Sequence, residues 1–258
     1  MSGFEQTGWR TVDYDPQLAD WVAGVLPHAR AAINDPANAH WLRCGGTWFA
    51  GVNVLPNTPD GSIGGSGPLR GAAVEYAATL IGAMPLWDPG QVSVIHPGYP
   101  RQGNESAPAF GYRQHRDAAH VDGLLRVGPD NRRMIREPHG FVLGVPLSET
   151  SAGASPLVVW QGSHRIIAAA LRRALAGHPP ATWADIDVTE AYHAARRTCF
   201  DTCARAVVHA RPGEAYLIHR HALHGVSPWQ DGASADPEGR IIAYFRPPLT
   251  SVADWLAD

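Results

Sequence analysis

Two stretches in the first third of the chain repeat apolar residues every three or four positions, the spacing of an amphipathic helix. The first runs from Pro16 to Asn34, with Pro27 interrupting it, and the second covers residues 69–84. The segment 44–67 between them is rich in Gly, Pro and Asn, and its GSIGGSG run lacks the Gly-Lys-Ser/Thr of a phosphate-binding loop. We therefore expect two helices joined by a turn or a mobile loop.

After Pro89 the pattern changes to short runs of apolar and β-branched residues, punctuated by glycine and proline. Two helical patterns, at 163–176 and 189–205, interrupt these runs. Strands are expected at 91–96, 111–114, 140–147, 156–160, 206–209, 214–219 and 240–246. Early helices, many later strands and a helical insert indicate an α+β chain built around an antiparallel β-sandwich or barrel.

Composition narrows the class of protein. A chain of 258 residues without a charge-rich linker is within reach of one large domain. The net charge of −3 gives no bulk attraction to nucleic acid or to anionic lipid. The opening MSGFEQTGWR has no apolar signal core, and no apolar run reaches membrane-spanning length. We expect a cytoplasmic protein with no nucleic-acid or membrane partner.

The chain contains no lysine, so all 21 basic residues are arginine. This excludes a Schiff-base lysine, a P-loop lysine and a lysine general base. An anchor for an anionic co-substrate must then be arginine, histidine, a hydroxyl or a backbone N–H. The three cysteines are too few for a disulfide framework. Arginines of the two late helices could bind an anion, but we interpret them as solvated helix faces: Arg165, Arg172, Arg173, Arg196 and Arg197.

Two His-x-Asp pairs are candidate metal ligands: His115-x-Asp117 and His120-x-Asp122. On a strand, residues two apart point to the same face, so both members of a pair can reach one ion. The two histidines differ by five positions and would face opposite sides of a regular strand. We favour His120 and Asp122, because Gly123 suits a strand end that opens into a loop, and we keep the other pair as an alternative.

A third ligand is expected in the run HRHALHGVSPW, about a hundred residues later. His219 and His221 share strand parity, whereas His224 lies beyond them, just before Gly225. A cluster of three histidines can also be hydrogen-bonded packing at a strand end. Given the upstream pair, we expect His224 to complete a 2-His-1-carboxylate set, which holds Fe(II) and leaves positions open for a co-substrate and O₂.

The order of these motifs resembles the phytanoyl-CoA dioxygenase family of Fe(II)/2-oxoglutarate oxygenases. After His-x-Asp come an apolar strand ending in Pro146-Leu147, then SPLVVWQGSH, a Gly-Glu turn, HRHALHG and the arginine-led RIIAYFRP. Gln161 stands where the family usually has proline, and the resemblance covers about residues 91–247 and does not extend to residues 1–90. The resemblance implies a jelly roll of eight strands, a double-stranded β-helix. One domain, 1–258, would then have a mainly helical part at 1–90 and a core at 91–247 with a helical insert at about 163–205.

The same resemblance assigns the residues of the site. The metal and catalytic residues would be His120, Asp122 and His224, and the anchor for 2-oxoglutarate would be Arg240. A guanidinium suits that role because the far carboxylate needs a permanent, bidentate cation inside a pocket. Arg246 shares the strand face of Arg240 but precedes two prolines, and we interpret it as a rim arginine. Further residues expected in the co-substrate pocket are Tyr244, Ser227, Gln91 and Ser93.

The sequence thus predicts an Fe(II)- and 2-oxoglutarate-dependent dioxygenase that hydroxylates a C–H bond of a small organic substrate, with succinate and CO₂ as co-products. Halogenating relatives resemble this site with a small residue where this chain has Asp122, so the carboxylate favours hydroxylation. Two other classes stay open: a metal-binding jelly roll without activity, and a cupin-type zinc or nickel isomerase or hydrolase with the same ligands and a water.

Overall fold

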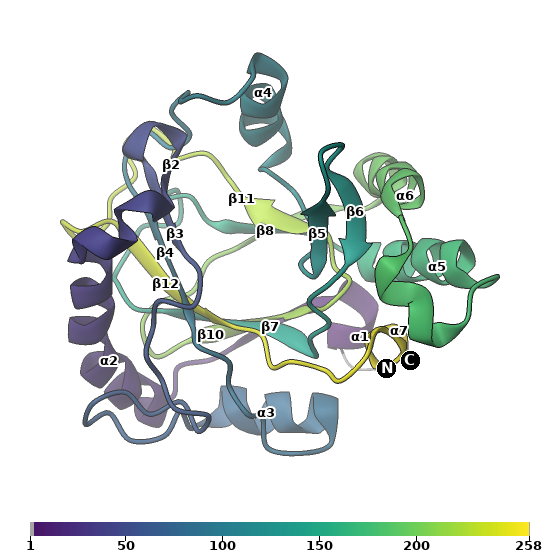
Figure 1. Ribbon diagram of the computed structural model, residues 1–258. Helices are drawn as coiled ribbons and strands as arrows, with labels where there is room; N and C mark the ends of the chain where they lie inside the picture. The colour runs from purple at the N-terminus through teal and green to yellow at the C-terminus, as the bar shows by residue number, and fades with distance from the viewer. Residues whose placement is uncertain (1–2, 258) are drawn as a thin grey trace.

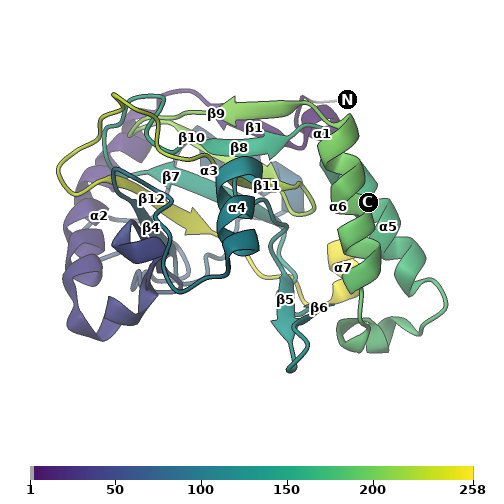
Figure 2. The same ribbon diagram turned by 90° about the horizontal axis from the view of Figure 1, so that it is seen from above.

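Residues 3–257 are described by the computed structural model, and residues 1, 2 and 258 lie outside that part. Two antiparallel sheets face each other and helices surround them (Figures 1 and 2). The larger sheet has the spatial order β1 (Trp9–Val12), β10 (Ala215–His219), β7 (Phe141–Pro146), β12 (Arg240–Phe245), β4 (Gln91–Ile95), β3 (Trp48–Gly51) and β2 (Leu42–Arg43). The smaller sheet has the order β11 (His224–Val226), β8 (Leu157–Trp160) and β9 (Arg205–Val208).

The smaller sheet gains a rudimentary fourth strand through the backbone of His120. The His120 amide donates to the His224 carbonyl at 2.8 Å, and the His224 amide donates back at 3.0 Å. With this bridge, four antiparallel members face the four strands β10, β7, β12 and β4 of the larger sheet. The predicted jelly-roll architecture with flanking helices is confirmed.

Side-chain alternation along β12 shows how the sequence builds both faces of the larger sheet. Ile242 packs between the two sheets, whereas its neighbours Ile241 and Ala243 belong to the apolar cluster on the outer face. Successive side chains of a strand point to opposite faces. The strand is buried on both sides because helices cover the outer face and the second sheet covers the inner one.

Helices α2 (Pro16–Asn34) and α3 (Ala72–Ile81) form that outer cover (Figure 1). The Asp15 carboxylate caps both of them, since it accepts hydrogen bonds from the amides of Gln17 at 2.8 Å and Ala72 at 2.7 Å. The helix predicted at Pro16–Asn34 is confirmed to its ends, with Pro27 inside it. The second predicted helix is shorter than 69–84 because Gly82 ends it in the left-handed conformation, at φ 72°.

The helical insert packs at the end of the smaller sheet. Helices α5 (Ser163–Leu175) and α6 (Thr189–Thr202) are joined by the 3₁₀ helix η3 (Pro180–Asp185). They share an apolar cluster with the C-terminal helix α7 (Val252–Leu256), with β8 and with the hairpin of β5 (Leu124–Val127) and β6 (Arg132–Ile135). Within residues 3–257, no helix has the length and apolar character needed to span a membrane.

Local structure differs from the sequence prediction in three places. Residues 111–114 are not a strand but part of helix α4 (Ala107–Arg116), which Ser106 caps and which carries a proline in its first turn. The segment 44–67 is not all loop, because it contains β3 and the 3₁₀ helix η2 (Cys44–Gly46). Residues 1–90 also contribute β1, β2 and β3 to the larger sheet, besides helix α1 (Gly3–Thr7) and the 3₁₀ helix η1 (Pro36–Trp41).

A group of three histidines lies between α1, α5 and β10, in which His164 and His221 are buried and His219 is half-buried. The His219 ring is 4.7 Å from the ring of His164 and 5.3 Å from that of His221, measured between centroids. Burial lowers the pKa of His219 to about 3 and holds the pKa of His221 well below its usual range. Both imidazoles are therefore neutral in the folded protein across the ordinary pH range.

Acid is expected to destabilise the protein through these histidines. Below the unfolded-state pKa of about 6.5 the unfolded chain binds protons that folded His219 cannot bind, so the free energy of unfolding falls as the pH falls. Each such histidine contributes a loss of about 2 kcal/mol between pH 7 and pH 5. In urea titrations of the metal-free protein, His219→Gln should lose about 2 kcal/mol less than the wild type over this interval. Exposed His115→Gln is the matched control, and equal losses in all three proteins would contradict the assignment.

Candidate metal centre

The structure brings the side chains of His120, Asp122 and His224 together. One ligand atom from each residue lies within 4.8 Å of the other two. Within residues 3–257 these three residues form the only cluster of His, Cys, Asp or Glu side chains that could hold a metal ion. Nε2 of His120 is 3.2 Å and Nε2 of His224 is 4.0 Å from Oδ1 of Asp122. The bridge between the two histidine backbones sets their side chains next to each other, and Asp122 follows two residues after His120, in the turn that leads into β5. Two imidazoles and one carboxylate thus surround one point.

Backbone carbonyls orient both rings. Nδ1 of His120 lies 3.0 Å from the carbonyl oxygen of Ala118, and Nδ1 of His224 lies 2.9 Å from that of Ala222. A carbonyl accepts only from an N–H, so each Nδ1 carries a proton and each Nε2 faces the centre. Burial, with the neighbouring His120, lowers the pKa of His224 to about 4, which keeps this ring neutral and able to bind a metal.

The carboxylate of Asp122 faces cations on more than one side. Burial opposes its ionisation, but the hydrogen bond from His120 and the charge of Arg246 outweigh burial and hold its pKa well below the usual range. Nη1 of Arg246 is 3.4 Å from Oδ2 of Asp122, and Nη2 is 3.4 Å from Oε1 of Gln91. Asp122 is therefore ionised, with one oxygen near the two imidazoles and the other near a guanidinium.

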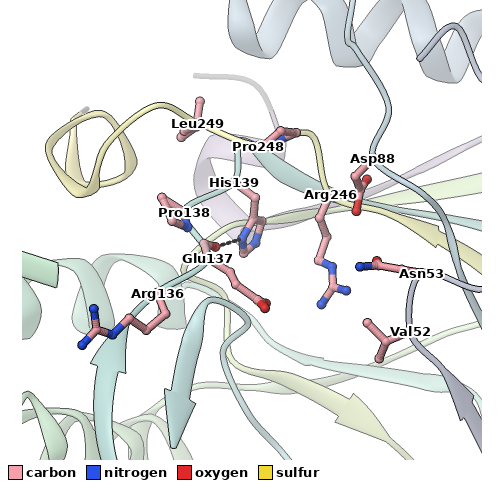
Figure 3. A pocket seen from close by; sticks show the side chains of 10 residues that line it. All are labelled: Val52, Asn53, Asp88, Arg136, Glu137, Pro138, His139, Arg246, Pro248 and Leu249. Atoms are coloured by element: carbon pink, nitrogen blue, oxygen red, sulfur yellow. Dashed lines mark hydrogen bonds between the residues drawn. The ribbon is translucent and has the colours of Figure 1, made fainter. Parts of the chain in front are cut away.

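Arg246 is not the rim arginine that the sequence suggested. Its side chain is only 17% exposed, and its backbone amide donates to Asp88 Oδ1 at 2.8 Å. Figure 3 shows its guanidinium between Asn53 and Glu137, in a cavity of about 370 Å³. The interpretation failed because the metal centre lies at the end of β12 rather than at its start, a relation that the position of Arg246 before two prolines does not reveal.

The three ligand side chains open onto a cavity of about 380 Å³ inside the jelly roll, which we call the metal pocket. Gln91 and Ser93 of β4 and Tyr244 of β12 line it, as expected for co-substrate residues, and Ser93 accepts a hydrogen bond from Trp48 Nε1 at 3.1 Å. Ser227 is placed elsewhere, since its hydroxyl accepts from Arg205 Nη2 at 3.4 Å. Apolar side chains complete the wall: Trp41, Val142, Leu157 and Val226.

Arg240 lies deeper in the jelly roll than the residues of the metal pocket, and it is buried at the start of β12 with 4% of its surface exposed. Tyr216 and Tyr244 flank Gly144 across three neighbouring strands, and the Tyr216 hydroxyl donates to the Tyr244 hydroxyl at 2.9 Å. A Cβ on Gly144 would overlap the Tyr216 ring, so the glycine makes room for the pair. Burial lowers the pKa of Arg240, but the Tyr244 and Tyr216 hydroxyls outweigh burial and raise it.

The guanidinium of Arg240 lacks an anion. Its Nη1 is buried without a hydrogen-bond partner, and no carboxylate within residues 3–257 forms an ion pair with it. A buried cation without a counter-ion is costly, so an anionic ligand at this position would stabilise the guanidinium. Tyr244 contacts both the metal pocket and this arginine, which connects the two.

The alternative His-x-Asp pair does not reach the centre. His115 is exposed on α4, a helix where a strand was predicted at 111–114. Asp117 ends that helix at φ 53°, and its two oxygens accept hydrogen bonds from Nε and Nη2 of Arg205, each at 2.8 Å. Asp117 is therefore committed to an ion pair that ties α4 to β9.

Two buried residues were not predicted from the sequence: His139 near Asp122, and Tyr216 next to Tyr244 and Arg240. His139 is buried with no partner for Nε2, and burial lowers its pKa while the charge of Asp122 raises it. Tyr216 had a usable signal, because it has the inward parity of Ile218 in the strand predicted at 214–219. His139 had none, since it lies in a loop between β6 and β7.

No protein-family model matches this chain, and no curated protein matches it. Among solved structures it is similar to the non-haem alpha-ketoglutarate-dependent epimerase SnoN from nogalamycin biosynthesis, at 15% identity and a TM-score of 0.51, over 94% of this chain and 80% of SnoN. The likeness is one of fold. A second SnoN structure, with Fe³⁺, alpha-ketoglutarate and nogalamycin RO, gives 16% identity, the same TM-score and the same coverage. Iron-bound EctD from S. alaskensis is 18% identical over 95% of this chain and 76% of EctD, with a TM-score of 0.49.

Proposed function

We propose that the protein is an Fe(II)- and 2-oxoglutarate-dependent oxygenase. The observation that carries this proposal is the combination, in one jelly-roll interior, of a 2-His-1-carboxylate donor set and a buried arginine without an anion. A structural zinc site would use four protein ligands and would not require the arginine. The shared fold of SnoN, which was solved with iron and alpha-ketoglutarate, supports the same class.

The residues of the site fit both Fe(II) and 2-oxoglutarate. His120, Asp122 and His224 would hold Fe(II), because their nitrogens and oxygen already converge and both Nε2 atoms face the centre. Arg240 would bind the far carboxylate of 2-oxoglutarate, with the Tyr244 hydroxyl beside it. When bound together, Fe(II) and 2-oxoglutarate would use O₂ to oxidise a C–H bond of the substrate, with succinate and CO₂ as co-products.

The chain itself contributes orientation, charge balance and exclusion of water. The Ala118 and Ala222 carbonyls fix the ring tautomers, and Asp122 supplies the negative charge that partly balances a divalent cation. Val142 and Leu157 give the metal pocket an apolar wall, which strengthens the attraction between Arg240 and a carboxylate.

Hydroxylation of a small organic substrate is the outcome we propose within this class, because a carboxylate occupies position 122. Membership of the phytanoyl-CoA dioxygenase family stays a prediction that rests on the order of motifs. The cupin-type zinc or nickel enzyme uses the same three ligands, but it leaves Arg240 without a role.

Oxygen consumption by metal-reconstituted protein separates these functions. The Fe(II) form should consume O₂ and form succinate only when 2-oxoglutarate is present, even without substrate, at the slow uncoupled rate. The Zn(II) and Ni(II) forms should consume none, and Fe(II)-loaded His224→Ala is the control for free iron. Equal O₂ consumption with and without 2-oxoglutarate would contradict the proposal.

A further inference from the structure

A second cavity, of about 750 Å³, lies beside the metal pocket, and we call it the side cleft. Four residues line both spaces, among them the ligand His120 and the aromatic Trp48. The other walls of the side cleft come from α4, α6 and the β5–β6 hairpin, which project beyond the two sheets (Figure 1). A molecule in the side cleft would therefore meet the metal centre on the side of His120.

The side cleft contains five arginines, and two of them are neutralised. Arg113 Nε is 2.8 Å from a carboxylate oxygen of Glu105, and Arg132 forms an ion pair with Asp187. The remaining three have no carboxylate partner within residues 3–257: Arg126, Arg133 and Arg196. The acidic residues of the side cleft, Asp130 and Glu190, are exposed and act on Arg132.

Arg133 is a partly buried cation beside other cations. It pairs across the hairpin with Arg126, and its Nη1 donates to the Leu124 carbonyl at 2.8 Å, so the position of the guanidinium is fixed. Burial lowers its pKa, the Tyr192 hydroxyl raises it, and the charges of Arg126 and Arg196 lower it further. Three neighbouring like charges destabilise one another unless an anion lies between them.

Arg196 reaches the same place from α6. Its guanidinium carbon lies 4.9 Å from the ring centre of Tyr112 and 5.4 Å from that of Tyr192, and its Nε is buried without a hydrogen-bond partner. The Tyr192 hydroxyl accepts from the amide of Val121, which lies between the two ligands of the His-x-Asp pair. The arginine is thus held in the cleft by aromatic rings, and the interpretation of Arg196 as part of a solvated helix face is wrong.

We propose that the side cleft is the substrate site and that Arg133 and Arg196 bind an oxyanion of the substrate, a phosphate, sulfate or carboxylate. This inference rests on the proposed function, because it takes the metal centre as the place of reaction. Guanidinium groups bind such oxyanions with paired, charge-assisted hydrogen bonds. Trp48 and Tyr112 line the same cleft and suit a flat apolar portion of the substrate.

Binding of phenyl phosphate to the metal-free protein tests this inference without relying on turnover. Calorimetric titration in the presence of a chelator should detect phenyl phosphate, and benzoate should show whether a carboxylate serves as well. Phenol, which has the ring without the anion, should not bind measurably. Arg133→Gln and Arg196→Gln should each raise the dissociation constant for phenyl phosphate about tenfold or more, since each removes charged hydrogen bonds.

Arg197→Gln is the matched control, because exposed Arg197 follows Arg196 on α6 and does not line the cleft. It removes the same net charge and should leave the dissociation constant within about twofold of wild type. Arg196→Lys, which keeps the charge, should retain part of the binding. Absence of phenyl phosphate binding, or equal weakening by Arg196→Gln and Arg197→Gln, overturns the inference. Iron affinity is measured separately on the same variants, so failure at the metal centre and failure in the side cleft are distinguishable.

Discussion

Replacing Asp122 with alanine is expected to lower the affinity of the protein for Fe(II) by at least about a hundredfold. Changing a residue that only orients a ligand typically costs 10- to 100-fold, and removal of a ligand costs more. The substitution also leaves Arg246 without the carboxylate it contacts at 3.4 Å, so an unbalanced cation remains beside the metal position. His224→Ala, which removes a nearly buried imidazole, should have a comparable effect. Competition with a chromogenic Fe(II) chelator under anaerobic conditions measures both affinities.

The control for this experiment is His115→Ala, which removes a histidine of the alternative pair from an exposed position on α4. It should bind Fe(II) as the wild type does. Wild-type iron affinity in both Asp122→Ala and His224→Ala would rule out the proposed ligands. A selective loss in His115→Ala would instead point to the alternative pair.

Replacing Arg240 is expected to raise the dissociation constant of the Fe(II)-loaded protein for 2-oxoglutarate by a factor of about 30 to 1,000. Two charge-assisted hydrogen bonds in a buried site contribute roughly 2–4 kcal/mol, which corresponds to this factor. Arg240→Gln keeps most of the side-chain volume, and Arg240→Ala removes it. Iron affinity should be nearly unchanged in both variants, because Arg240 contacts tyrosine hydroxyls rather than the metal ligands. Anaerobic calorimetric titration with 2-oxoglutarate measures the effect.

Arg246→Gln is the comparison that identifies the anchor. Arg246 contacts Asp122 and Gln91, so its loss should disturb iron binding and change the affinity for 2-oxoglutarate less than Arg240→Gln does. A larger loss of 2-oxoglutarate affinity in Arg246→Gln would show that Arg246 holds the far carboxylate. Equal iron and 2-oxoglutarate losses in the Arg240 variants would show that this arginine acts through the fold.

The jelly roll was predictable where local pattern and long-range structure agree. The strands predicted at 91–96, 140–147 and 240–246 are rich in apolar and β-branched residues, and they form the centre of the larger sheet. Helix α2 follows its apolar spacing from cap to end. The three candidate ligands were predictable as a set because the His-x-Asp spacing and one later histidine mark them in the sequence. In the structure a backbone bridge between His120 and His224 brings them together.

Local pattern fails where a tertiary contact decides the structure. β3 is four residues long and lies in a glycine-rich segment, and it is a strand because Phe49 pairs with Val94 on β4. Helix α4 did carry a signal, Ser106 followed by a proline in the first turn, which outweighs the short strand-like run at 111–114. The positions of Arg246 beside Asp122 and of Arg196 beside Arg133 depend on the packing of separate elements, which no single-segment pattern encodes.

The most direct test of the metal centre and its co-substrate pocket is a crystal structure of the protein with Fe(II) and 2-oxoglutarate, prepared without O₂. An anomalous difference map at the iron absorption edge should give one peak at coordination distance from His120 Nε2, Asp122 and His224 Nε2. The far carboxylate of 2-oxoglutarate should lie within hydrogen-bond distance of the Arg240 guanidinium. Iron bound elsewhere, or a far carboxylate bound to Arg246 with Arg240 still unpaired, would contradict this account.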